Sequence, residues 1–436
     1  MGSYVFMSEF FKRIKDDPRI RNSFWMLIEK SIALFGLIFI ISAVAKYTGP
    51  SIYGEISLAA SIFIVIKTIA QLGLDQIFFK YVSQKKPFHF LFFKNASKLV
   101  SIIYLILSFV IIFISYFYAS TTGFYFILAT FLAYYFNSID LLNAYYEGVL
   151  LSKINVFANV IGLLISLVMR WVIVVLEMDY IYLCVPIVLM TLIPFLIKLF
   201  FYYKKYLISS KVILKKTVKN KRYMAYLLGA GFPLMLAVIT ATVNGQAANF
   251  LLGYLENTAS VGIFSIAFVL AGAWCIVPTT LIMSYMTSIY SINNNDYSTY
   301  IKTSSKITRN ITLMSLFIVF VLYVLSPYFI DWLYGKEFYQ SIEIFKYLIF
   351  FQLLWVINFL FSRIIIKFNG FRFLAVKSII LCFLNIIISY TLIKEKGMLG
   401  AAFALIIVEA LSFISNFLFK PAKFLNIVFK IGVTKS

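Results

Sequence analysis

Ionisable side chains interrupt three long apolar stretches of this sequence. Lys67 lies in IFIVIKTIAQ, Arg170 in SLVMRWVIVV and Glu409 in LIIVEALSF. Within a membrane-spanning stretch, such a charge costs about 2.5–3.5 kcal/mol on insertion scales, so it normally faces a polar cavity. We predict that these three side chains line a cavity of this kind.

Other charges lie nearer the ends of their apolar stretches. Lys30, Asp140 and Arg363 are at intermediate depth. Because lysine and arginine stems can carry a charge to the membrane interface, these basic residues either reach that interface or face the cavity. The residues that we interpret as lying at an interface are Asp75, Glu147, Lys198 and Lys346.

The basic residues within the apolar stretches predict a cavity that binds an anion. Arginine and lysine recognise phosphate groups well, so a diphosphate is a natural ligand. The candidate substrate-binding residues are Lys30, Lys67, Arg170 and Arg363. Acidic residues at similar depth could bind and release an ion during transport, and the candidates for this role are Glu409, Asp75 and Asp140.

The most polar patch in the apolar stretch at 226–252 is NGQAANF, which contains Asn244, Gln246 and Asn249. Amide side chains inside a membrane protein form hydrogen bonds between helices or contact a substrate. The sequence leaves both interpretations open for these three residues.

Motifs for enzymatic chemistry are missing from the sequence. We find no glycine-rich phosphate loop, no nucleophile elbow and no paired acids in a loop. The three cysteines lie in apolar stretches, and the single histidine, His89, has no cysteine or histidine neighbours that could complete a metal site. We therefore expect no catalytic residue, no metal and no bound cofactor. A secondary transporter fits best, with protons or sodium ions as the coupling ion.

The composition is that of an integral membrane protein. Of the 436 residues, 62% are hydrophobic and only 13% are charged, whereas soluble proteins have about a quarter charged residues. A membrane helix needs roughly 20 apolar residues. We predict twelve such helices at about 24–46, 54–76, 98–119, 122–144, 156–176, 180–203, 226–252, 260–289, 309–330, 344–367, 373–393 and 397–419.

Lysine and arginine predict the orientation in the membrane, because they accumulate in cytoplasmic loops. Basic residues crowd the two termini and the even-numbered loops, above all the segment KKYLISSKVILKKTVKNKR, whereas the odd-numbered loops contain only Lys46, Lys336, Lys394 and Lys396. We predict a multi-pass protein with both termini in the cytoplasm. The net charge of +22 is thus a signal of orientation and of contact with anionic lipids, and does not predict nucleic-acid binding.

The basic segment divides the chain into two halves with six predicted helices each. We predict an N-terminal lobe at 1–203, a basic cytoplasmic linker at 204–222 and a C-terminal lobe at 223–436. YGEISLA, which contains Gly54, aligns with VGIFSIA, which contains Gly262, at an offset of 208 residues. Because six is an even number, the lobes share one orientation and form a parallel pseudo-two-fold repeat. Gly49 and Pro50 form a tight turn between the first two helices, and we expect Gly54 to let those two helices pack closely.

Several segments resemble Wzx-type polysaccharide flippases, within the group that includes the MATE multidrug exporters. They include RNSFWMLIEK, YTGPSIYGEISLA, AQLGLDQIFFKYVS, FLLGYLENTASVGIFSIAFVLAGAWCIVP, DWLYGKEFYQS and GMLGAAFALI. The resemblance covers essentially the whole chain. It implies a MATE-like all-α membrane fold and location in the bacterial cytoplasmic membrane. Many relatives have an acid before the LG pair of the seventh helix, where this chain has Ala248. Any role of that acid is therefore either absent here or supplied by another residue such as Glu409.

The resemblance also implies a function and partners. Family members move oligosaccharides linked to undecaprenyl diphosphate, such as O-antigen repeat units, from the cytoplasmic to the periplasmic leaflet by alternating access. The implied partners are this lipid-linked oligosaccharide, membrane lipids, and the polysaccharide polymerase and chain-length proteins of the pathway.

Three alternatives remain open. A MATE-like drug or cation antiporter shares the fold, but a cavity for cationic drugs would be acidic. A membrane polymerase or ligase would need a long extracytoplasmic loop, and the longest odd-numbered loop, DWLYGKEFYQSIE, is short. A major-facilitator carrier also has two sets of six helices, but its glycine- and arginine-rich loop between the second and third helices is missing here.

Overall fold

The computed structural model describes residues 25, 29–84, 89–209, 220–293 and 296–429. These residues form helices and connecting turns, with no strand among them. In chain order the helical elements are η1 (Leu37–Ile41), α3 (Ser42–Gln71), α4 (Leu74–Ser83), α5 (His89–Tyr118), α6 (Thr121–Ile139), α7 (Leu142–Gly148), α8 (Ser152–Val175), η2 (Tyr180–Leu183), α9 (Cys184–Ser209), α10 (Asn220–Leu255), α11 (Thr258–Ala273), α12 (Ile276–Ser291), α13 (Tyr297–Tyr334), η3 (Lys336–Phe338), α14 (Gln340–Lys367), α15 (Phe371–Asn416), η4 (Lys420–Ala422) and α16 (Phe424–Phe429).

Many of these helices can cross a membrane. In the described part of the chain, eight helical segments are long and apolar enough, and the bent pair α11 and α12 would make a ninth. Apolar side chains cover their outer faces, including Phe109, Phe317 and Phe383, which are each more than half exposed. In water this surface would be unfavourable, whereas in lipid it is not. The predicted all-helical membrane class is confirmed, and the number of twelve membrane helices stays a prediction.

Two of the segments are long enough to cross twice. Glu29–Gln71 has 43 residues and Phe371–Asn416 has 46, so each would extend roughly 65–70 Å as a straight helix, about twice the thickness of the hydrocarbon core. Both contain a break in helical backbone, at Gly49 (φ 72°) and at Gly397 (φ 59°). The predicted turn at Gly49 and Pro50 is therefore a sharp kink between two helical stretches.

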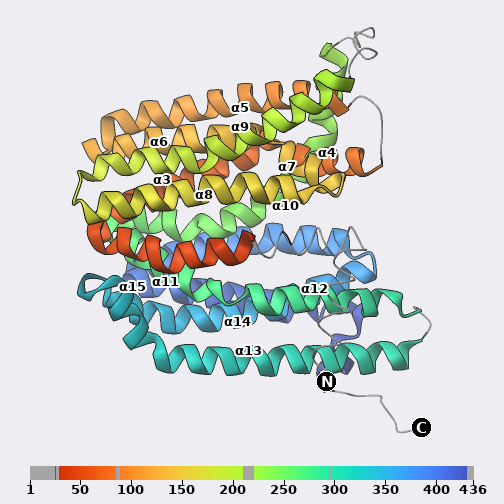
Figure 1. Ribbon diagram of the computed structural model, residues 1–436. Helices are drawn as coiled ribbons and strands as arrows, with labels where there is room; N and C mark the ends of the chain where they lie inside the picture. Colours follow the sequence, from red (N-terminus) through yellow and green to blue (C-terminus); the bar gives the residue numbers. More distant parts are fainter. Residues whose placement is uncertain (1–24, 26–28, 85–88, 210–219, 294–295, 430–436) are drawn as a thin grey trace, which may run out of the picture. The chain divides into compact units, whose positions relative to one another are not determined.

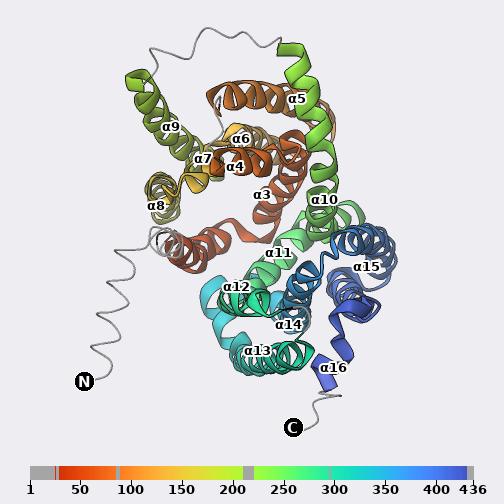
Figure 2. The same ribbon diagram turned by 90° about the vertical axis from the view of Figure 1, so that its right-hand side faces the viewer.

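The chain divides into two compact units, which we describe separately. One comprises the described residues of Met1–Thr48 and Ala59–Thr242, and the other Gly49–Leu58 and those of Val243–Ser436. In the first unit α8 and α6 pack against α9 (Figure 1), and in the second α11, α13 and α15 pack against α14 (Figure 2). The predicted lobe boundaries at 203 and 223 stay a prediction, and 210–219 of the linker lie outside the described residues.

The two copies of the predicted repeat meet inside the second unit. A Cβ atom on Gly54 would lie 1.7 Å from the carbonyl oxygen of Thr258, and a Cβ on Gly262 would lie 2.1 Å from that of Pro50. The offset of 208 residues relates Gly54 to Gly262 and also Pro50 to Thr258, so the contact is symmetric within the repeat. The expectation that Gly54 packs against the first helix was wrong, because its close neighbour is α11.

An aspartate caps the start of α13 and makes the stability of this helix end depend on pH. Asp296 precedes this helix and accepts hydrogen bonds from the backbone N–H of Thr299 and the hydroxyl of Ser298, both at 3.1 Å. Hydrogen bonding to Thr299 holds the pKa of Asp296 below its ordinary value of 3.8. The Asp296 carboxylate therefore stabilises the first turn of α13 fully above the ordinary aspartate pKa. This stabilisation is lost as the pH falls through the lowered pKa of Asp296.

We expect Asp296→Ala to speed amide hydrogen exchange in the first turn of α13 at neutral pH, because the alanine cannot accept these bonds. Asp296→Asn should leave the exchange nearly unchanged, since asparagine is an equally good N-cap. Hydrogen exchange followed by mass spectrometry measures both. Equal exchange in the alanine variant and the wild type would mean that the cap does not hold this turn.

Candidate functional site

The first part of the site is a break at the end of α3. Leu72 and Gly73 both have left-handed backbone, with φ values of 52° and 65°. The chain then re-enters a helix as α4, with Asp75 in its first turn. The free N–H groups at a helix N-terminus stabilise a negative charge, so this break creates a favourable position for an acid inside the fold.

The second part is a break between α6 and α7. Asp140 ends α6 with non-helical backbone (φ −77°, ψ 66°), and α7 begins at Leu142. Ending a helix leaves backbone carbonyl groups without helical partners. The side-chain nitrogen of Gln71, at the end of α3, donates to one of these, the carbonyl of Ser138, at 3.1 Å. This hydrogen bond joins the two breaks.

A polar cavity of about 500 Å³ lies beside these breaks, inside the first unit. Its lining comes from α3, α4, α7 and the last turn of α6. The residues are Lys67, Gln71, Asp75, Gln76, Phe79, Asn137, Asp140, Asn143, Ala144 and Glu147. Asp75 and Asp140 are near enough to Lys67 to attract its ammonium group electrostatically. The cavity therefore contains one cation and three carboxylates, a more acidic set than the sequence predicted.

Lys198 of α9 neutralises one of these carboxylates. Its ammonium group forms an ion pair with Asp140, and the side chains of the two residues are 1% and 7% exposed. The same nitrogen donates to the side-chain oxygens of Asn143 at 3.0 Å and Asn159 at 3.2 Å. The interpretation of Lys198 as an interface anchor was wrong, because its charge is held in the interior by three oxygen acceptors.

Hydrogen bonds extend from Lys198 to other helices. The amide nitrogen of Asn159 donates to Glu29 at 2.8 Å, and the hydroxyl of Tyr146 donates to the backbone carbonyl of Lys198 at 3.0 Å. Asp140 Oδ1 is buried and has no hydrogen-bond partner among the described residues. One carboxylate oxygen of Asp140 thus holds the lysine, and the other is buried without a hydrogen-bond partner in this part of the structure.

The structure brings together three of the predicted site residues, which are Lys67, Asp75 and Asp140. Lys30 and Arg170 belong to the same unit but are not among the residues that line the cavity. Lys30 is exposed, and Arg170 is half-buried near the end of α8. Their predicted role in substrate binding stays a prediction.

Glu147, Asn143 and Gln71 also line the cavity, although the sequence did not predict this. A signal for two of them was present, because Asp140, Asn143 and Glu147 follow the i, i+3, i+7 spacing of one helix face. Glu147 was interpreted as an interface residue, and the structure places it in the cavity. Gln71 had no such signal, since its partner is the carbonyl of Ser138, 67 residues away.

The second unit contains a separate buried polar chain. Asn358 donates to the carboxylate of Glu409 at 2.6 Å, Asn416 donates to Asn358 at 2.8 Å, and Lys377 donates to Asn416 at 2.7 Å. Two amides thus connect the lysine to the acid. Glu409 is buried within α15, as its place in the sequence suggested, and its part in ion coupling stays a prediction.

The remaining predicted residues also lie in the second unit. Asn244 accepts from Asn385 of α15 at 2.6 Å. Asn249 accepts from Ser265 of α11 at 3.3 Å and donates weakly to Gln246 at 3.5 Å. The contacts of Asn244 and of Asn249 with Ser265 join α10 to other helices, whereas the contact with Gln246 lies within α10. They leave the substrate-binding interpretation untested.

The Arg363 guanidinium lies 4.7 Å from the centre of the Phe359 ring. Its Nε atom is buried and has no hydrogen-bond partner in the described part of the chain. Among the described residues, no group of three or more histidine, cysteine, aspartate or glutamate side chains could hold a metal ion.

Solved structures share this fold. The lipid II flippase MurJ in an inward closed conformation matches with a TM-score of 0.66 and 17% identity, over 96% of this chain and 94% of that chain. An inward-facing multidrug resistance MATE family transporter of the MOP superfamily also has a TM-score of 0.66, with 14% identity over 96% and 100% of the two chains. The eukaryotic MATE transporter AtDTX14 has a TM-score of 0.54 and 13% identity, over 97% and 99%. These likenesses confirm the predicted MATE-like fold.

No curated protein matches the sequence. A family profile described as polysaccharide biosynthesis protein matches residues 43–343. The matched region includes the kink at Gly49, both helix breaks, the cavity and Lys198. It covers more than half of the chain and agrees with the resemblance seen in the sequence. The chain therefore belongs to the polysaccharide biosynthesis protein family.

Proposed function

We propose that this protein moves an oligosaccharide linked to undecaprenyl diphosphate, such as an O-antigen repeat unit, from the cytoplasmic to the periplasmic leaflet. Membership of a polysaccharide biosynthesis family and a fold shared with a lipid II flippase support this proposal. The observation that carries it is the charged cavity at the two helix breaks, which contains Lys67 within a membrane-spanning fold. The protein acts in the bacterial cytoplasmic membrane with both termini in the cytoplasm, beside the polymerase and chain-length proteins of its pathway.

In this proposal the diphosphate enters the polar interior while the polyprenyl chain stays in the lipid. Lys67, Lys30, Arg170 and Arg363 neutralise its charge as the protein alternates between inward and outward access. A cavity of about 500 Å³ falls within the range for small ligands. It suits a diphosphate or an ion better than a whole oligosaccharide, so the sugars occupy another space.

The carboxylates of the cavity supply the coupling step in this scheme. Glu147 lines the cavity, and Asp75 and Asp140 attract Lys67 there. Asp140 holds Lys198 through one carboxylate oxygen, and its other oxygen has no hydrogen-bond partner among the described residues. Binding of a proton or a sodium ion at these acids would weaken their attraction for Lys67. Lys67 would then be free to bind the diphosphate, which links ion binding to substrate binding.

The test is genetic complementation in the host. We expect Lys67→Ala combined with Arg170→Ala to abolish surface polysaccharide, with single repeat units accumulating on the cytoplasmic side and with normal amounts of protein in the membrane. Lys67→Arg should retain part of the activity because it keeps the positive charge. Lys80→Ala is the matched control, since Lys80 is exposed on α4.

Normal surface polysaccharide in the double variant would refute the assignment of the binding residues. Repeat units accumulating on the periplasmic side after deletion of the gene would instead indicate a polymerase or ligase.

The acidic cavity supports a second candidate, a drug or cation antiporter. Because Lys198 neutralises Asp140, the carboxylates of Asp75 and Glu147 remain against Lys67, and this balance favours a cationic ligand more than the sequence suggested. A drug-susceptibility panel on the deletion strain separates the two functions. Sensitivity to cationic drugs with unchanged polysaccharide would favour the antiporter.

A further inference from the structure

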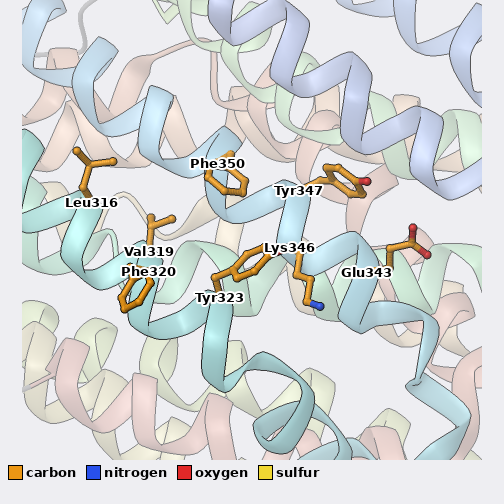
Figure 3. A pocket seen from close by; sticks show the side chains of 8 residues that line it. All are labelled: Leu316, Val319, Phe320, Tyr323, Glu343, Lys346, Tyr347 and Phe350. Carbon is orange, nitrogen blue, oxygen red and sulfur yellow. The ribbon is translucent and has the colours of Figure 1, made fainter.

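A second cavity lies on the outer face of the second unit, between α13 and α14. It measures about 740 Å³ and is lined by Leu316, Val319, Phe320, Tyr323, Glu343, Lys346, Tyr347 and Phe350. Figure 3 shows the aliphatic and phenylalanine side chains at one end and the two charged residues at the other. The groove is therefore amphipathic along its length, as a lipid molecule is.

The apolar part of the groove has a floor and two walls. Val319 is 3% exposed and forms the floor, whereas Phe320 is 67% exposed and Phe350 is 43% exposed. The rings of Tyr323 and Phe350 pack against each other with centres 6.2 Å apart. From Tyr323 to Leu316 the helix rises about 10 Å, enough for part of an acyl chain to lie along it.

The charged end lies near the start of α14. Glu343 and Lys346 are the fourth and seventh residues of this helix, about 4.5 and 9 Å from its first residue along the axis. The Lys346 ammonium lies 5.2 Å from the centre of the Tyr323 ring. Within the described part of the chain, no carboxylate oxygen approaches Lys346 within ion-pair distance. Glu343 and Lys346 therefore present separate opposite charges at the mouth of the groove.

We propose that this groove binds a phospholipid with a phosphoethanolamine head group, taken from the surrounding bilayer. The phosphate pairs with Lys346, the primary ammonium donates to Glu343, and one acyl chain lies over Val319 between the aromatic walls. The two side chains are one helical turn apart, so their Cβ atoms are about 5–6 Å apart, which suits charges joined by two carbon atoms. An anionic lipid such as phosphatidylglycerol satisfies Lys346 alone and leaves Glu343 facing a negative head group.

Photocrosslinking of the full-length protein tests this site. The protein is placed in phosphatidylcholine nanodiscs with a trace of phosphatidylethanolamine that has a diazirine in its acyl chain, and labelled peptides are mapped by mass spectrometry. We expect stronger labelling of peptides from 316–323 and 343–350 than of the α5 peptide containing Phe109 and Phe113. Those two α5 residues are 69% and 59% exposed and provide an apolar surface outside the groove.

Competition and variants identify the head group. Unlabelled phosphatidylethanolamine should displace the label about fivefold more effectively than phosphatidylglycerol with the same acyl chains. Lys346→Gln should lower groove labelling by up to about fivefold, the upper end of what an exposed ion pair contributes. Glu343→Gln should make the two competitors equal. Lys396→Gln is the matched control, because Lys396 Nζ lies 5.4 Å over the Phe403 ring outside this groove.

Three results would overturn the proposal. Equal labelling of α5 and the groove would mean that lipids contact this face without preference. Equal competition by the two lipids in the wild-type protein would mean that Glu343 does not select the head group. Stronger displacement by a polyprenyl diphosphate would assign the groove to a transported lipid. These competition results use the wild-type protein and do not depend on the folding of any variant.

Discussion

Replacing Gly54 with alanine is expected to destabilise the protein strongly and to lower both its yield and its activity. The added Cβ would lie 1.7 Å from the carbonyl oxygen of Thr258 and 2.6 Å from its carbonyl carbon. These are backbone atoms, so no side-chain rotation can relieve the clash and α11 would have to move. Overpacking costs typically 1–3 kcal/mol, and we expect roughly the upper end of this range. The amount of monodisperse protein extracted from membranes, measured by fluorescence-detected size-exclusion chromatography, checks this.

The chain provides a matched control for this substitution. Gly245 also lies in a helix, α10, but an added Cβ there would meet nothing within 4 Å. Gly245→Ala should therefore leave the protein unchanged or slightly more stable, since alanine is the better helix former. Gly262→Ala should match Gly54→Ala, because a Cβ there meets the carbonyl oxygen of Pro50. Normal yield and activity in Gly54→Ala would show that the two helices do not cross this closely.

Replacing Lys198 with methionine is expected to destabilise the first unit by about 3–5 kcal/mol, the usual effect of removing one partner from a buried ion pair. Methionine keeps much of the apolar stem but leaves the Asp140 carboxylate uncompensated beside Asn143 and Asn159. Burying an unpaired charge is the main cost. The thermal midpoint of the purified protein in detergent measures the loss, and it should fall by several degrees.

A double variant separates the lost charge balance from lost packing. Lys198→Met with Asp140→Asn should recover most of the stability, because neither side chain is then charged. Lys153→Met is the control, since Lys153 is an exposed lysine of α8 in the same unit. If Lys198→Met and its control had the same thermal midpoint, the buried ion pair would not contribute to stability. If adding Asp140→Asn to Lys198→Met did not restore the thermal midpoint, the loss of stability would be due to lost packing of the lysine side chain.

The sequence predicted the charged residues of the site better than their partners. Lys67 and Asp140 were identified because each is a charge within an apolar stretch, and both line the cavity. Lys198 was also in an apolar stretch, but the same local pattern describes a lysine that reaches the interface. Only the packing of α9 beside α6 shows that the Lys198 ammonium is paired in the interior and does not reach the interface, since its partner Asp140 is 58 residues away in the chain.

One of the helix breaks could be predicted from the local sequence, whereas another depends on residues far away in the chain. Gly49 followed by Pro50 predicted the kink in α3 from local chemistry, because a glycine easily adopts the positive φ found there. The break at Asp140 has no glycine or proline at its centre. It is compensated by contacts from elsewhere, namely the hydrogen bond of Gln71 to Ser138 and the ion pair with Lys198.

The sequence alone determined that this protein is helical and lies in a membrane, and that charges lie at depth within several of its helices. These properties follow from composition and spacing along the chain, because the transfer of each stretch into lipid depends mainly on its own residues. The tertiary structure decided which charges share a cavity, which carboxylate Lys198 neutralises, and that Gly54 meets α11. Those outcomes depend on contacts between residues tens to hundreds of positions apart, which no local pattern specifies.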